Sequence, residues 1–192
     1  MRLKDGIDKN IRNFSYIDKN TITTPFFTKE YCDYLIDKLE EVEWKIDPYG
    51  NCENNLQKIK DGQTACKDYF DVIKEKIEPE IIKNWSYAFR ECRLWQYYPD
   101  PFAKKYTLQG QTDLKKHVDS TLLTFLIKLN DNFGGCNTIL PRQNWDTGKL
   151  NVGGMVIFPG TITPHYVEKL KWGSKYSLIG RISRLQCDVR EG

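Results

Sequence analysis

Residues 121–130 (TLLTFLIKLN) constrain the fold of this chain more than any other segment. Leu123, Phe125, Ile127 and Leu129 occupy every second position in it. Successive side chains of an extended strand point to opposite faces, so these four side chains share one face. The segment therefore predicts a β-strand that buries an apolar face in the core of a sheet.

Two helices and several shorter strands are expected around this segment. Thr28 is a suitable N-cap for a helix over residues 29–43, and a second helix starts near Lys67 and breaks or restarts at Pro79. Residues 45–65 are rich in Asn, Gly, Asp and Gln and predict a loop. Further strands are expected at residues 21–24, 89–95, 155–158 and 176–183. Helices followed by short strands favour an α+β domain with a β-sandwich or barrel-like core.

Length and charge narrow the class of protein. The 192 residues suffice for one domain with a substantial core. Residues 1–20 are mostly polar and predict an N-terminal arm, followed by a single domain over residues 21–192. The net charge of +3, from 29 basic and 26 acidic side chains, gives no support to a nucleic-acid binder. Apolar runs are short and the N-terminus is charged, so neither a membrane span nor a signal peptide is expected, and the compartment stays open.

The chain contains only two histidines, and both stand beside predicted strands. His117 opens the sequence His-Val-Asp, and His165 lies between two later strands. Residues two apart on extended backbone point to the same face, so His117 and Asp119 can share one face while Val118 points away. Two imidazoles and a carboxylate can form the facial triad of a non-haem iron(II), which leaves coordination positions open. The alternative is a histidine that merely lies beside an aspartate, because His-x-Asp also occurs by chance.

A lysine and a hydroxyl residue follow the second histidine at a suggestive distance. Lys175 stands ten residues after His165, and Tyr176 and Ser177 come next at the start of a predicted strand. A cation there can pair with a carboxylate of a co-substrate bound to the metal, and a neighbouring hydroxyl can add a hydrogen bond. Arg181, further along the same strand, is a rival for this role.

Six short segments carry a recognisable pattern: 117–121 (HVDST), 129–130 (LN), 134–136 (GGC), 158–160 (FPG), His165 and 175–176 (KY). Together they resemble the catalytic domain of 2-oxoglutarate-dependent protein hydroxylases. The resemblance is closest to the procollagen lysyl hydroxylase branch, including its viral relatives, and covers most of residues 21–183. Two residues depart from that branch: Lys175 stands where lysyl hydroxylases usually have Arg and prolyl 4-hydroxylases have Lys, and Tyr166 stands where the lysyl branch tends to have Glu.

The resemblance implies a double-stranded β-helix, or jelly-roll, core with flanking N-terminal helices. It also implies that iron(II), 2-oxoglutarate and O2 take part in the reaction, with ascorbate a candidate reductant. Iron would be bound by His117, Asp119 and His165. The distal carboxylate of 2-oxoglutarate would be bound by Lys175, and further contacts to this co-substrate would come from Tyr97 and, more weakly, Thr124 and Ser177.

The implied activity is hydroxylation of a protein side chain, lysyl before prolyl, with succinate and CO2 as co-products. The expected partner is a peptide or protein, collagen-like by analogy, with no membrane or nucleic-acid partner; the oligomeric state stays open. Glu168 and Asp146 are candidates for contacting a lysyl ammonium group. The alternatives are a dioxygenase of the same core acting on a small molecule or nucleobase, a non-catalytic jelly-roll binding module, and a zinc hydrolase, since two His and one Asp can also hold zinc.

Overall fold

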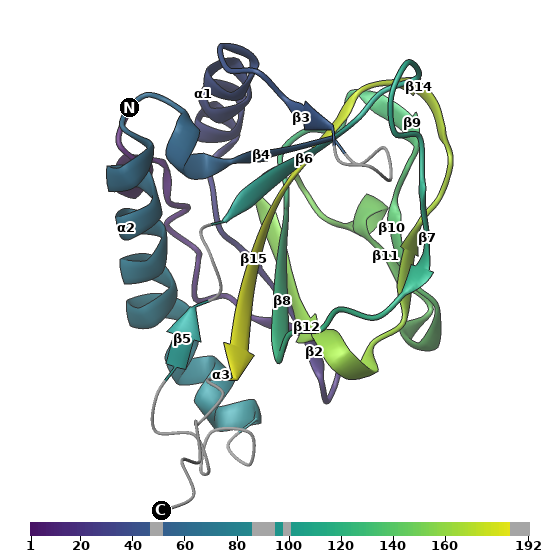
Figure 1. The fold of residues 1–192 in the computed structure, drawn as a ribbon. Helices are drawn as coiled ribbons and strands as arrows, with labels where there is room; N and C mark the ends of the chain where they lie inside the picture. The colour runs from purple at the N-terminus through teal and green to yellow at the C-terminus, as the bar shows by residue number, and fades with distance from the viewer. Residues whose placement is uncertain (47–51, 86–94, 98–100, 185–192) are drawn as a thin grey trace, which may run out of the picture.

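Two facing β-sheets form the body of the protein, and helices pack on the outer side of the larger sheet (Figure 1). The computed structural model describes residues 1–46, 52–85, 95–97 and 101–184, and at residues 95–97, 183 and 184 it describes the backbone alone. The helices are α1 (Lys29–Glu40), α2 (Gly62–Val72) and α3 (Glu78–Asn84), with a π-helical turn (Ile73–Ile77) between α2 and α3.

The larger sheet has nine strands in the part of the chain that is described, and all of its pairs are antiparallel. In order across the sheet, its strands are β1 (Ser15–Asp18), β2 (Thr21–Pro25), β12 (Gly154–Pro159), β8 (Leu123–Lys128), β15 (Lys175–Arg184), β6 (Phe102–Tyr106), β4 (Cys52–Asn55) and β3 (Lys45–Ile46), with β5 (Trp95–Tyr97) also paired to β15.

The smaller sheet faces it and closes the jelly roll, as expected for a double-stranded β-helix core. Its four strands, in order, are β11 (Trp145–Asp146), β10 (Thr138–Leu140), β13 (His165–Val167) and β7 (Leu114–His117). A two-stranded ribbon of β14 (Leu170–Gly173) and β9 (Phe133–Gly135) extends beyond one end. The mixture of helices and antiparallel sheets confirms the predicted α+β class.

Strand β8 has both faces covered, whereas its sequence predicted one buried face. Leu123, Phe125 and Ile127 belong to the main core cluster, which also includes buried side chains of α1 and α2. Leu126 points to the other side and packs in a smaller cluster with Leu140 of the second sheet. The space between the two sheets is therefore apolar around Leu126. Polar side chains can occupy the part of this space away from Leu126.

The helix predictions hold for α1 and differ for α2. The Thr28 side chain accepts a hydrogen bond from the Tyr31 N–H and caps α1, which ends at Glu40 rather than residue 43. Helix α2 begins at Gly62, earlier than the predicted Lys67. The helix does restart at Pro79, which occupies the first turn of α3, where its missing N–H costs no hydrogen bond.

Two further segments differ from their predictions because tertiary contacts decide their structure. Residues 45–65, expected as a loop, contain β3 and β4; the polar residues of β4 become a strand by pairing with β6. The first twenty residues do not form a separate arm, because Leu3 and Ile11 are buried in the core and β1 pairs with β2.

The predicted strand at 89–95 lies outside the described residues except for Trp95 in β5. None of the helices in the described part of the chain is long and apolar enough to cross a membrane.

Candidate metal centre and co-substrate pocket

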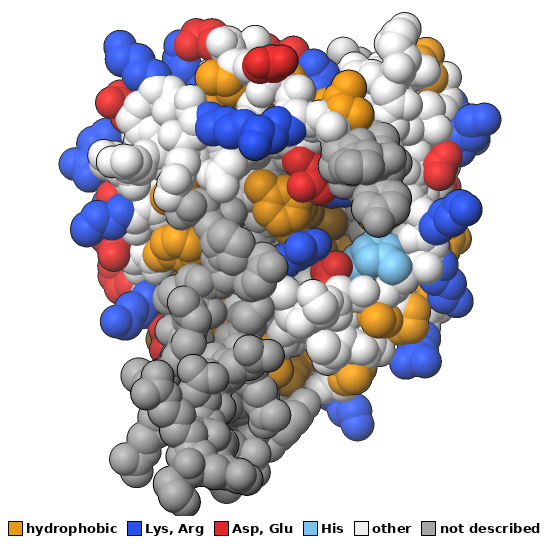
Figure 2. Space-filling model, in the orientation of Figure 1, with side chains coloured by type: hydrophobic (Ala, Val, Ile, Leu, Met, Phe, Trp, Pro, Cys, Tyr) orange, Lys and Arg blue, Asp and Glu red, His pale blue; other side chains and the backbone are white. Residues whose placement is uncertain are grey.

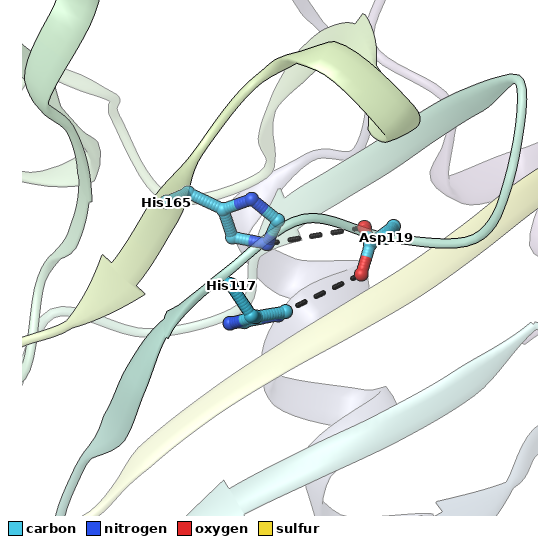
Figure 3. A group of neighbouring side chains, drawn as sticks. All are labelled: His117, Asp119 and His165. Atoms are coloured by element: carbon cyan, nitrogen blue, oxygen red, sulfur yellow. Dashed lines mark ion pairs between the residues drawn. The ribbon is translucent and has the colours of Figure 1, made fainter.

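The smaller sheet brings the two histidines together. His117 ends β7 and His165 begins β13, and the two residues are direct partners in this antiparallel pair. Asp119 follows two residues after His117, in the connection to β8. Its carboxylate oxygens lie 3.6 Å from His117 Nε2 and 3.8 Å from His165 Nε2. The three side chains converge on one point (Figure 3), a grouping that a single metal ion can hold.

Backbone contacts orient both imidazole rings toward this point. His117 Nδ1 lies 2.8 Å from the Lys115 carbonyl oxygen, and His165 Nδ1 lies 3.0 Å from the Thr163 carbonyl oxygen. A carbonyl only accepts hydrogen bonds, so each Nδ1 must carry the proton. The Nε2 lone pairs are then free to bind a metal, and the carbonyl contact is the usual support for a metal-binding histidine.

The third candidate ligand, Asp119, is held as a buried carboxylate. Its side chain is only 5% exposed, Thr124 Oγ1 donates a hydrogen bond to Oδ2, and Arg181 lies 3.4 Å from Oδ1. Burial raises the pKa of Asp119, but the neighbouring His117, the hydrogen bond from Thr124 and the charge of Arg181 outweigh burial and bring the pKa to about 2. The group is therefore ionised at neutral pH, as a metal ligand must be.

Lys175 is a buried cation at the start of β15. Its Nζ donates to Thr138 Oγ1 at 3.1 Å and lies 5.1 Å from the centre of the Tyr106 ring. Among the residues that the structure describes, no carboxylate forms an ion pair with Lys175. Burial lowers its pKa to about 8. An uncompensated buried charge is costly, so this position suits an anionic group that is supplied by a ligand.

One cavity of about 270 Å³ joins the candidate metal ligands to this lysine. Alternate residues of β15 line one wall: Lys175, Ser177, Ile179 and Arg181. Because alternate residues of a strand share a face, these four side chains all point between the two sheets. Figure 2 looks onto the face where a histidine, an acid and a cation gather around a hollow with a hydrophobic floor.

The remaining residues expected to contact the co-substrate have different surroundings. Ser177 lines the cavity, and its buried hydroxyl has no hydrogen-bond partner among the described residues. Thr124 also lines the cavity, where its hydroxyl donates to Asp119. The Tyr97 backbone pairs with Ile182 on β15, while its side chain lies outside the described residues.

Several residues that line the cavity were not expected from the sequence, and two of them are Tyr106 and Glu53. Tyr106 is the cross-strand partner of Lys175, and Glu53 reaches the cavity from β4. Neither belongs to a recognisable local motif; only the pairing of β6 with β15 and β4 could reveal them. The acids proposed for a lysyl ammonium do not line the cavity: Glu168 accepts hydrogen bonds from Asn137, and Asp146 caps the turn at Gly148.

The arrangement of the sheets is that of the 2-oxoglutarate- and iron(II)-dependent oxygenases. A viral collagen prolyl hydroxylase from Paramecium Bursaria Chlorella virus-1 superposes with a TM-score of 0.60 and 15% identity, covering 87% of this chain and 97% of that one. A Pseudomonas putida prolyl-4-hydroxylase superposes with a TM-score of 0.62 and 16% identity, covering 86% and 92% of the two chains. These likenesses establish the fold and confirm the jelly-roll core that the resemblance implied.

In sequence, the chain is similar to a procollagen lysyl hydroxylase and glycosyltransferase of Acanthamoeba polyphaga mimivirus, with 22% identity over 189 residues. The match includes 91% of this chain but only 21% of the viral protein, so the chain spans about a fifth of that relative. No family model matches the chain.

Proposed function

We propose that this protein is an iron(II)- and 2-oxoglutarate-dependent hydroxylase of protein side chains. The observation that carries the proposal is the pairing, in one cavity, of a His-Asp-His cluster with a buried lysine that lacks a carboxylate partner among the described residues. A dicarboxylate that chelates a metal with one end needs a cation for its other end. A zinc hydrolase, which activates water, has no need for such a lysine.

Each residue of the cavity has a defined role in this proposal. His117, Asp119 and His165 hold the metal, and the Thr124 hydroxyl fixes the carboxylate of Asp119. When bound, iron(II) with 2-oxoglutarate and O2 supplies the oxidising chemistry, which yields succinate, CO2 and a hydroxylated target, with ascorbate a candidate reductant.

The co-substrate is held at its distal end by three side chains. Lys175 supplies the charge, and the Ser177 hydroxyl, which lacks a partner among the described residues, can add a hydrogen bond. Tyr106 packs against Lys175 and walls off this end of the cavity, where it is 2% exposed. Low exposure strengthens the ion pair, since little water competes for the lysine or for the carboxylate.

We further propose that the target is a lysyl side chain in preference to a prolyl one. The similarity to the mimivirus lysyl hydroxylase supports the lysyl target, and the two prolyl hydroxylases of the same fold support the alternative. The names of all three proteins describe hydroxylation of lysyl or prolyl residues, which are part of a peptide chain. Lys175 stands where prolyl 4-hydroxylases have lysine and therefore also supports the prolyl alternative. Peptides that carry only one of the two target residues distinguish lysyl from prolyl hydroxylation.

The test is to incubate the protein with iron(II), 2-oxoglutarate and collagen-like peptides that carry either lysine or proline alone. We expect succinate together with a lysine-containing product that is heavier by one oxygen atom. Hydroxylation confined to the proline peptide would reverse the ranking. Turnover only with a free metabolite or a nucleobase would show that the target is not a protein side chain. No turnover under any condition would favour a non-catalytic binding module.

The pKa of Lys175 predicts how co-substrate binding depends on pH. Burial lowers this pKa to about 8, and the neutral amine that forms above it cannot pair with a carboxylate. Affinity for 2-oxoglutarate should therefore fall as pH rises above about 8. The fall should continue until the pH exceeds the pKa of Lys175 in the complex, which the bound carboxylate raises. Calorimetric titrations with redox-stable Mn²⁺ in place of iron would measure this dependence.

Lys175→Arg serves as the control for this prediction, because arginine stays protonated throughout the range. The affinity of Lys175→Arg for 2-oxoglutarate, whatever its absolute value, should not fall above pH 8. A decline of equal size in both proteins would show that another group, such as a metal-bound water, controls the dependence.

A further inference from the structure

One ion pair in the cavity has no part in the proposed function. Among the described residues, five charged side chains line this cavity: the cations Lys104, Lys175 and Arg181 and the acids Glu53 and Asp119. Asp119 is assigned to the metal with Arg181 beside it, and Lys175 is assigned to the co-substrate. The Glu53–Lys104 pair remains.

This pair is placed by the cross-strand register of β4 and β6. Glu53 and Lys104 are direct partners in the antiparallel pair, and Glu53 Oε1 lies 3.0 Å from Lys104 Nζ. The two side chains differ in exposure: 38% for Glu53 and 10% for Lys104. The acid therefore lies at the opening of the cavity and the lysine lies deeper. A group that enters from solvent can therefore reach the Glu53 carboxylate.

A carboxylate at the opening is matched to a positively charged target. Lys104 is buried but Glu53 is 38% exposed, and a carboxylate has two oxygens, so a second ammonium group can bind Glu53 from the solvent side while Lys104 keeps its partner. Glu53 and the metal cluster line the same cavity of about 270 Å³, which keeps both within reach of one long side chain. Glu168 and Asp146, the other acids considered, line no part of this cavity.

We propose that Glu53 is a specificity-determining residue that binds the ammonium group of a lysyl target. The assignment rests on the proposed function, which gives the other charges of the cavity their roles. It supplies the physical basis for a preference of lysine over proline, because a proline ring has no group for Glu53 to bind.

The experiment compares binding of two collagen-like peptides, one with lysine at the target position and one with norleucine, which has the same straight carbon chain without the charge. Binding is measured with iron(II) and 2-oxoglutarate present and oxygen excluded, so that no turnover contributes. We expect the wild-type protein to bind the lysine peptide roughly tenfold more tightly, the effect of one charged hydrogen bond. Glu53→Gln should bind both peptides equally.

Two further variants make the result specific. Lys104→Gln removes the competing ammonium group and should widen the preference for lysine. Glu40→Gln is the matched control. The Glu40 carboxylate forms an equivalent ion pair, 2.7 Å from the Nζ of Lys105, which follows Lys104 on β6. Glu40 lies outside this cavity. It should keep the wild-type preference.

The assignment is overturned if the wild-type protein shows no preference for the lysine peptide or if that preference survives Glu53→Gln. A narrower preference in Lys104→Gln, or loss of the preference in Glu40→Gln, would overturn it too. Failure of the proposed function would look different: the protein would form no succinate in air, whatever its preference among the peptides. A lysine preference that depends on Glu53 in a protein without turnover would leave the binding assignment standing.

Discussion

Replacing His117, Asp119 or His165 with alanine should abolish succinate formation. Each substitution removes one of the three proposed protein ligands, and the remaining two cannot hold iron(II) in a facial arrangement. The effect should be the largest of any single substitution in the chain. Succinate release with 2-oxoglutarate and a lysine peptide, at matched iron concentrations, measures it. Turnover near the wild-type rate in any of the three variants would remove that residue from the metal centre.

The same variants should remain folded, because the core around them is apolar packing and not a metal-dependent staple. A divalent ion that binds the folded state raises its melting temperature. We therefore expect added Mn²⁺ to raise the melting temperature of the wild-type protein and of Asp131→Ala, an exposed acid outside the cavity, but not of the three variants. A metal-induced shift that persists in all three would place the ion elsewhere.

Replacing Lys175 with alanine should raise the requirement for 2-oxoglutarate far more than it weakens metal binding. Removing one partner of a buried charged pair costs about 2–5 kcal/mol, which corresponds to roughly one and a half to three and a half decades in affinity. Lys175→Arg should be milder because the charge is kept, although the forked guanidinium fits the buried site differently. The apparent KM for 2-oxoglutarate and the affinity for Mn²⁺ measure the two effects separately.

Lys169→Ala provides a control for this substitution, because Lys169 is exposed and lines no part of the cavity. It should leave the KM for 2-oxoglutarate unchanged. An unchanged KM in Lys175→Ala would instead move the distal carboxylate to another cation. Arg181 would then be the first candidate, since it lines the same cavity and lies 3.4 Å from Asp119.

The candidate site was predictable where its residues belong to short local patterns. His117 and Asp119 are two residues apart on extended backbone, and that spacing alone predicts a shared face. Lys175 and Ser177 follow the same rule on β15, and the structure places both in the cavity. The pairing of His117 with His165, 48 positions apart by their numbers, needed the family resemblance as well as the pattern.

Local sequence also determined the core strand and the first helix of this protein. The alternation in residues 121–130 and the cap at Thr28 act between neighbours in the chain, so they can be recognised without the fold. Tertiary structure alone decided that Leu3 and Ile11 are buried and that the polar strand β4 joins the larger sheet. It alone placed Glu53 opposite Lys104 and Tyr106 opposite Lys175, because strand register is set by contacts between distant segments and leaves no local signal in either.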